Sequence, residues 1–195
     1  MCEIAQLIWN RKLTNAYGGN FAVRASASSF VVTPSMMAEE KHCKLVPEDL
    51  MLVDFDCAIL EGDGRLSRET EMHAALLRAF PTVGAVIHAH PMNAMVFASA
   101  ERPIPSVTEA TEQQEEAGLV EFAPMCTPEM SANVLAYYEK RRSLTERLPL
   151  ACVLPKHGVV ITGKDLNNAF AMLELVETDA YCALNRIFLK AKSPL

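Results

Sequence analysis

The stretch VIHAHP, residues 86–91, decides the fold and points to a functional site. It places two of the chain's 5 histidines, His88 and His90, directly after apolar residues that are typical of a buried strand. Side chains on a strand alternate between its two faces, so we expect His88 and His90 to project side by side from one face. Two imidazoles so placed can bind one metal ion, but two unrelated polar residues at a strand end would give the same pattern. The pair alone leaves both interpretations open.

Other residues elsewhere in the chain favour the metal. Glu69 and His73 lie four residues apart on one face of a helix predicted over 67–80, although spacing alone does not bring Glu69 to the strand end. His157 interrupts two apolar strands in KHGVV, where a turn histidine without a function is the simpler alternative. Three histidines and one carboxylate make a complete set for catalytic zinc, which typically keeps three protein ligands and an open position. His42, in the charged stretch EEKHCK, is expected to be a solvated surface residue.

Composition predicts one domain over residues 1–195, because the chain has 195 residues of which 50% are hydrophobic and 22% charged. A net charge of -6 without a basic cluster argues against nucleic acid as a partner. No apolar stretch is long enough to cross a membrane, and the N-terminal MCEIAQLIWNRKL lacks the basic region of a signal peptide. The 6 cysteines form no CxxC pair. We therefore expect a cytoplasmic protein with reduced thiols and no membrane partner.

Hydrophobic periodicity and turn signals predict α/β layers around a largely antiparallel sheet. Helices are predicted over 2–13, 67–80, 91–100, 127–142 and 165–191, and strands over 21–25, 28–33, 50–54, 83–90, 151–154 and 157–163. Ser67 and Thr127 are the expected N-caps of their helices. Residues 33–37 are expected to form a loop and residues 61–65 a turn, and the region 102–125 gives mixed signals.

Four stretches resemble the class II aldolase/adducin family in order and spacing, namely GGNFAVR, VVTPS, SRETEMHAALLRAFPTVGAVIHAHP and KHGVVITGKDLNNAFAMLELVE. The resemblance runs from about residue 4 to about residue 188, and its combination of ExxxH, HxHP and a distant HG in one small domain is specific. It implies a three-layer αβα sandwich, a homotetramer with active sites between subunits, and one zinc ion. His88 and His90 match the family's paired metal ligands, and His157 matches the third.

The resemblance also implies roles for residues outside the histidine cluster. Glu69 matches the catalytic acid/base, which can also sit on the metal when no substrate is bound. Gly19 and Asn20 match the start of a phosphate cradle, for which a plain hairpin turn is the alternative. Ser35 and Ser67 match hydroxyl positions of the same cradle, and Ser67 would lie at a helix N-terminus, where an anion is favoured.

Three positions depart from the pattern of the family's aldolases. Met36 stands where glycine usually follows the TPS step, and Arg68 replaces a second serine before the catalytic glutamate. Arg68 can either strengthen phosphate binding or bind a substrate carboxylate. Glu109 stands about where a tyrosine protonates a departing oxygen, and is either an acid/base or an exposed residue. These departures weaken any assignment to fuculose phosphate itself.

Three functions are therefore weighed. The first is a zinc-dependent aldolase that cleaves a ketose 1-phosphate to dihydroxyacetone phosphate and an aldehyde through an enediolate. The second is a decarboxylase of a 3-keto sugar-acid phosphate that uses the same zinc site, with Arg68 suited to the acidic substrate. The third is an adducin-like scaffold without chemistry, which is disfavoured because such domains tend to lose the metal ligands that this chain retains.

Overall fold

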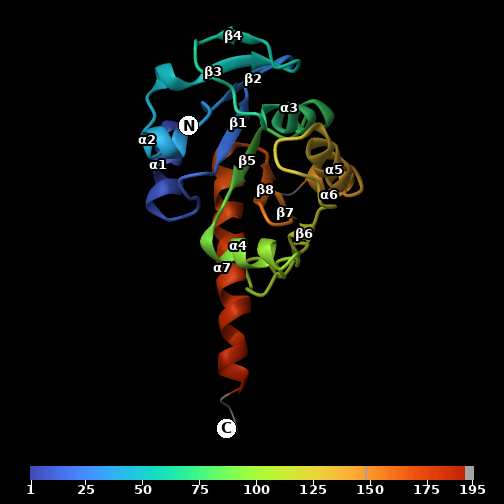
Figure 1. Ribbon diagram of the computed structural model, residues 1–195. Helices are drawn as coiled ribbons and strands as arrows, with labels where there is room; N and C mark the ends of the chain where they lie inside the picture. The colour runs from blue at the N-terminus through green and yellow to red at the C-terminus, as the bar shows by residue number, and fades with distance from the viewer. Residues whose placement is uncertain (148, 192–195) are drawn as a thin grey trace.

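The computed structural model describes residues 1–147 and 149–191 as an eight-stranded sheet with helices on both faces (Figure 1). The strands are β1 (Asn20–Arg24), β2 (Ser29–Val32), β3 (Met51–Asp54), β4 (Ile59–Glu61), β5 (Ala85–Ala89), β6 (Gly118–Leu119), β7 (Leu150–Leu154) and β8 (Gly158–Gly163). The helices are α1 (Cys2–Asn10), α2 (Met37–Lys41), the 3₁₀ turn η1 (Pro47–Asp49), α3 (Thr70–Ala79), α4 (Met92–Ser99), α5 (Pro128–Glu139), α6 (Arg142–Thr145) and α7 (Leu166–Ala191). None of the helices within the described residues combines the length and apolar character needed to cross a bilayer.

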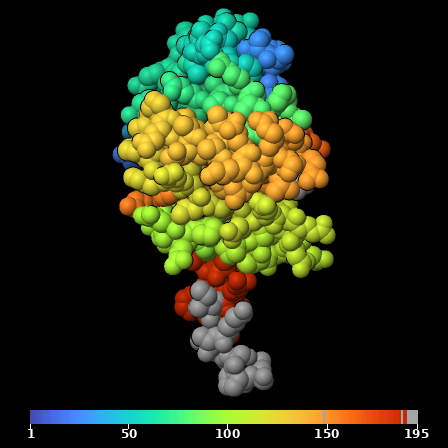
Figure 2. Space-filling model, turned by 90° about the vertical axis from the view of Figure 1, so that its right-hand side faces the viewer, coloured from blue at the N-terminus to red at the C-terminus, as the bar shows by residue number. Residues whose placement is uncertain are grey.

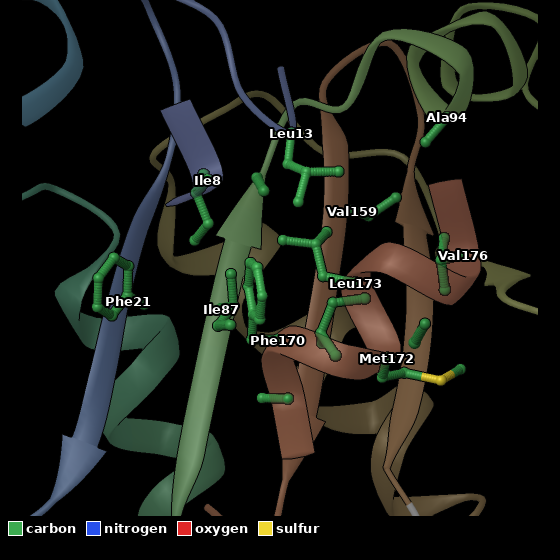
Figure 3. Packing of buried hydrophobic residues seen from close by; sticks show 14 of the residues in the cluster. Ile8, Leu13, Phe21, Ile87, Ala94, Val159, Phe170, Met172, Leu173 and Val176 are labelled. Carbon is green, nitrogen blue, oxygen red and sulfur yellow. The ribbon is translucent and has the colours of Figure 1, made fainter. Parts of the chain in front are cut away.

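The sheet has the order β4-β3-β2-β1-β5-β8-β7-β6, and its neighbours pair antiparallel except β6 and β7, which are parallel. Alternate residues of each central strand enter separate cores: Ile87 packs with α1, α2, α4 and α7, whereas Val86 packs with α3 and α5. Figure 3 shows the first of these cores, with Ile87 and Val159 of the sheet near Phe170 and Leu173 of α7. The expected three-layer αβα sandwich around a largely antiparallel sheet is confirmed.

Helix α7 contacts the N-terminus of α4, the helix that follows β5, and then extends beyond the body of the molecule (Figures 1 and 2). Helix α4 begins just after β5, and its N-cap, Pro91, offers no side-chain hydrogen bond. The Glu177 carboxylate of α7 accepts hydrogen bonds instead from the backbone N–H groups of Asn93 and Ala94, both at 2.9 Å, and from the Asn93 side chain at 2.7 Å. These donors are the ones that a helix N-terminus leaves without partners.

Several local predictions are corrected. Helix α3 begins at Thr70, so Ser67 is not its N-cap; Glu69 occupies that position, and the Ser67 hydroxyl accepts a hydrogen bond from the Glu69 N–H at 3.2 Å. The loop expected over residues 33–37 is confirmed up to Met36, a residue in the left-handed conformation, and the unpredicted helix α2 starts at Met37. Strand β4 went unpredicted because all of its residues are exposed, so it lacks the alternation of a half-buried strand.

In the second half of the chain, one predicted helix cap is confirmed and two predicted boundaries are corrected. Thr127 is confirmed as the N-cap of α5, where its hydroxyl accepts a hydrogen bond from the Met130 N–H at 3.2 Å. The helix predicted over 127–142 is interrupted, because α5 ends at Glu139 and α6 follows. His157 precedes β8 and belongs to the turn after β7.

We predict that Glu177→Gln lowers the free energy of unfolding by about 1–3 kcal/mol, because the introduced amide group points N–H against backbone donors. Glu174→Gln is the matched control on the same helix, since its carboxylate meets only the exposed Arg11, and it should cost less than about 1 kcal/mol. Urea unfolding followed by circular dichroism measures both. Equal losses in the two variants would contradict the capping role of Glu177.

Candidate metal and substrate site

One cavity of about 480 Å³ gathers the predicted metal ligands, the predicted acid/base and the residues of the predicted phosphate cradle. Its lining includes Gly19, Asn20, Ser35, Ser67, Arg68, Glu69, His88, His90 and His157. The volume is within the usual range for small-molecule pockets. The cavity lies at the carboxyl end of β5, on the face of the sheet that α3 covers.

Three histidines from two separate parts of the chain meet in this cavity. His88 and His90 come from the end of β5, and His157 comes from the turn between β7 and β8. One ring nitrogen from each lies within 4.8 Å of the others. His88 and His90 do lie on one face, as their spacing predicts, with their Nε2 atoms 3.0 Å apart.

Hydrogen bonds at the far side of the His88 and His90 rings determine which of their nitrogens are free. His88 Nδ1 lies 3.0 Å from the Val159 carbonyl, so this nitrogen donates and the Nε2 atom keeps a lone pair. His90 Nδ1 lies 3.4 Å from Asn15 Oδ1, an oxygen that also accepts the Tyr17 N–H at 3.0 Å. His90 therefore also presents a lone pair at Nε2. Two lone pairs facing each other at this distance fit a shared cation, and outer hydrogen bonds of this kind are typical of metal-binding histidines.

Glu69 completes the cluster from the start of α3. Its side chain is buried, with Oε1 3.3 Å from His157 Nε2 and Oε2 3.5 Å from His88 Nε2. Neither contact has hydrogen-bond geometry, and Oε1 has no hydrogen-bond donor among the described residues. A buried carboxylate oxygen without a donor is rare. Three imidazoles and one carboxylate are a donor set that suits a divalent cation such as zinc.

Burial keeps the imidazoles in the form that binds metals. Burial lowers the pKa of His88 well below its usual value, and it lowers the pKa of His90 to about 3, with a further contribution from neighbouring His88. The pKa of His157 is also lowered by burial. The three rings are thus neutral near neutral pH, as ligands to a metal must be.

Two glycines make room for the His90 ring, and the sequence interpretation gave neither of them a role. A Cβ atom on Gly18 would lie 1.9 Å from His90 Nδ1. A Cβ atom on Gly158 would lie 2.6 Å from both His90 Cδ2 and the Ala89 carbonyl oxygen. The only signal in the sequence was their position next to predicted site residues, in the GG and HG pairs.

The residues expected to form a phosphate cradle line the same cavity, where Asn20 and Ser67 adjoin Glu69. Gly19 has φ +97°, a conformation that favours glycine. The Ser35 N–H donates to the Arg65 carbonyl at 2.8 Å, so its hydroxyl is the group left to meet a ligand. The Ser67 oxygen already accepts two hydrogen bonds, from the Asn20 amide at 3.3 Å and from the Glu69 N–H, which leaves its own hydrogen to donate.

The residues that depart from the family pattern lie in different environments. Met36 borders the cavity with φ 61°, so it adopts the left-handed conformation that glycine would adopt without strain. Arg68 is exposed at the cavity, where Arg65 joins it. Glu109 is exposed and is not among the described residues that line the cavity. Cys126 also lines the cavity, and nothing in the sequence around it signalled this.

We predict that the purified protein binds one divalent zinc ion per chain and that His157→Ala lowers zinc affinity by at least about 10–100-fold, the loss typical of removing even an outer partner. His42→Ala is the matched control, because His42 is exposed and outside the cluster. Mass spectrometry of the metal content and calorimetric titration measure the effect. Undiminished zinc in the His157 variant would refute the site.

Comparisons with known proteins identify the family of the chain. The model of the class II aldolase and adducin N-terminal domain family matches residues 1–184. The L-fuculose phosphate aldolase of Methanococcus maripaludis is 26% identical over 90% of this chain and 89% of its own length. The methylthioribulose-1-phosphate dehydratase of Pectobacterium atrosepticum is 29% identical over 91% and 88%. A solved L-fuculose 1-phosphate aldolase superposes with a TM-score of 0.81, at 25% identity over 100% of this chain and 86% of that one. The chain belongs to the class II aldolase and adducin family.

Proposed function

We propose that this protein is a zinc-dependent aldolase that cleaves a ketose 1-phosphate to dihydroxyacetone phosphate and an aldehyde through an enediolate. The observation that carries the proposal is the buried Glu69 carboxylate, which faces three neutral imidazoles inside a cavity of small-molecule size. Its relatives in the family include lyases of both the aldolase and the dehydratase type. A scaffold without chemistry would have no need to keep this set of buried polar groups.

Glu69 is the proton carrier in this proposal. In the cleavage direction, the C4 hydroxyl passes its proton to the Glu69 carboxylate, the C3–C4 bond of the ketose breaks to release the aldehyde, and the electron pair of that bond is left on C3 as an enediolate. Glu69 then donates a proton to C3, and in the reverse direction its carboxylate removes that proton. His88, His90 and His157 would hold the zinc ion, which would supply positive charge to stabilise the enediolate. Asn20 keeps the Glu69 carboxylate in place through a 2.7 Å hydrogen bond to Oε2.

The substrate's phosphate is proposed to bind between Gly19, Asn20, Ser35 and Ser67, with help from Arg68. Both hydrogens of the Asn20 side-chain amide are used within the protein, on Glu69 and Ser67, and its backbone pairs with His88 of β5, so Asn20 would support the cradle by holding Ser67. The free hydroxyl hydrogen of Ser67 and the exposed guanidinium group of Arg68 support an anion in this part of the cavity.

A homotetramer with sites between subunits is proposed as the working form. The outer turns of α7 support it, because Tyr181, Phe188 and Leu189 are 55%, 67% and 76% exposed there. Apolar side chains of this size, gathered on a helix that leaves the body, are typical of surfaces that bury against another chain. A cytoplasmic location is proposed from the scattered, free cysteines.

The alternative function is a decarboxylase of a 3-keto sugar-acid phosphate. Two guanidinium groups at one cavity, those of Arg65 and Arg68, favour it, because an acidic substrate offers a second anion for them. Product analysis separates the candidates. Dihydroxyacetone phosphate with an aldehyde supports the aldolase, carbon dioxide supports the decarboxylase, and loss of water alone would point to the dehydratase activity named for some relatives.

We predict that Glu69→Gln keeps zinc and fold but slows exchange of the C3 hydrogen of dihydroxyacetone phosphate with deuterated solvent by about 10²–10⁴-fold, because a general base is lost. Glu71→Gln, at an exposed position of the same helix, should leave the exchange unchanged. Nuclear magnetic resonance follows the exchange without any need to know the aldehyde. Exchange at the wild-type rate in the Glu69 variant would assign the base to another residue.

We predict that Arg68→Ala raises KM about 10-fold or more for the phosphorylated substrate but not for its dephosphorylated analogue, because a charge-assisted contact is lost only with the phosphate. Arg78→Ala is the control, since Arg78 pairs with Asp56 and does not line the cavity. Steady-state kinetics on both substrates tests this. A similar rise in KM for both analogues would place Arg68 away from the phosphate.

A further inference from the structure

His73 is a fully buried histidine that the proposed mechanism does not use. It lies one turn after Glu69 on α3, and its side chain has no exposure to solvent. Its Nε2 atom lies 2.5 Å from Asn20 Oδ1, whereas its Nδ1 atom has no hydrogen-bond partner among the described residues. A buried ring with one nitrogen left unpaired is a poor choice for packing alone, because the unpaired group keeps its desolvation cost.

The contact on Asn20 selects one of two orientations of that amide. Asn20 Nδ2 lies 2.7 Å from Glu69 Oε2, and an ionised carboxylate can only accept hydrogen bonds. The amide must therefore turn its NH₂ group to Glu69 and its oxygen to His73. That oxygen in turn requires a hydrogen on His73 Nε2. The opposite tautomer would set a lone pair against the oxygen and favour a flipped amide, with oxygen facing the Glu69 carboxylate.

We propose that His73 is a positioning residue whose Nε2–H fixes the Asn20 amide, so that the amide holds Glu69 Oε2 and leaves Oε1 facing the histidine cluster. The inference rests on the proposed function only for the role that it gives Glu69. The contacts run from His73 on α3 to Asn20 on β1 and back to Glu69 at the start of α3. The packing of α3 on β1 therefore sets the positions of both His73 and Asn20 relative to Glu69. Burial lowers the pKa of His73 to about 4, so the ring is neutral near neutral pH and has one hydrogen to place.

Two amide substitutions separate this role from a merely structural one. Glutamine places its side-chain NH₂ group about where histidine has Nε2, whereas asparagine places it about where histidine has Nδ1. We expect His73→Gln to retain kcat for C3 hydrogen exchange within about 3-fold, and His73→Asn and His73→Leu to lower it about 10–100-fold, the range seen when an outer partner is removed. KM and zinc content should stay unchanged in all three variants. Equal losses in the glutamine and asparagine variants would show that His73 serves packing only.

A measurement without substrate keeps the inference independent of the proposed function. Nitrogen-15 magnetic resonance of the zinc-loaded protein should find a hydrogen on His73 Nε2 and none on Nδ1. It should also find two slowly exchanging hydrogens on the Asn20 amide, which become fast in His73→Leu and slow again in His73→Gln. A hydrogen on Nδ1, or an Asn20 amide indifferent to the substitution, overturns the positioning role. If the wild type exchanges no C3 hydrogen while these signals appear as expected, the proposed function fails and the positioning of Glu69 stands.

Discussion

The register between β1, β5 and β8 is the constraint on which the rest of the site depends. In this register Asn20 lies opposite His88, and His88 lies opposite Val160. Residues opposite each other in antiparallel strands share a face, so Asn20 and His88 emerge side by side toward α3. A slip of one residue between β1 and β5 would turn either Asn20 or His88 toward the opposite core. Helix α3 packs on this face, and because it begins just after Glu69, it places the Glu69 carboxylate against both Asn20 and His88.

The sequence predicted the architecture and the histidine cluster well, because both depend on local patterns. Alternation fixed the shared face of His88 and His90, and the interruption of an apolar run marked His157. The contacts of Asn20 could not be predicted in this way, since they depend on how close α3 lies to β1. Ser67 was expected as a helix cap because its sequence context suits one. In the structure, helix α3 begins only at Thr70, and Glu69 at the N-cap position lies against the histidine cluster.

Three of the eight described non-glycine residues with positive φ lie at or beside the cavity. Met36 and Cys126 line it with φ values of 61° and 60°, and Lys156, directly before His157, has φ 60°. Each left-handed residue other than glycine costs about 1–2 kcal/mol. Such strain is tolerated where the surrounding structure holds it, and the two cores on either side of the sheet provide that support.

The position of β5 between β1 and β8 also sets the order in which the protein can mature on the ribosome. When β5 emerges, β1 is already available to pair with one of its edges, but β8 has still to be translated. Until then the strand offers its other edge, rich in valine, isoleucine and alanine, to any extended chain nearby. Glu177, which secures the helix that follows β5, is made later still. The nascent chain therefore passes through an interval in which its central strand is open to mispairing, and this interval lasts until β8 and α7 have been made.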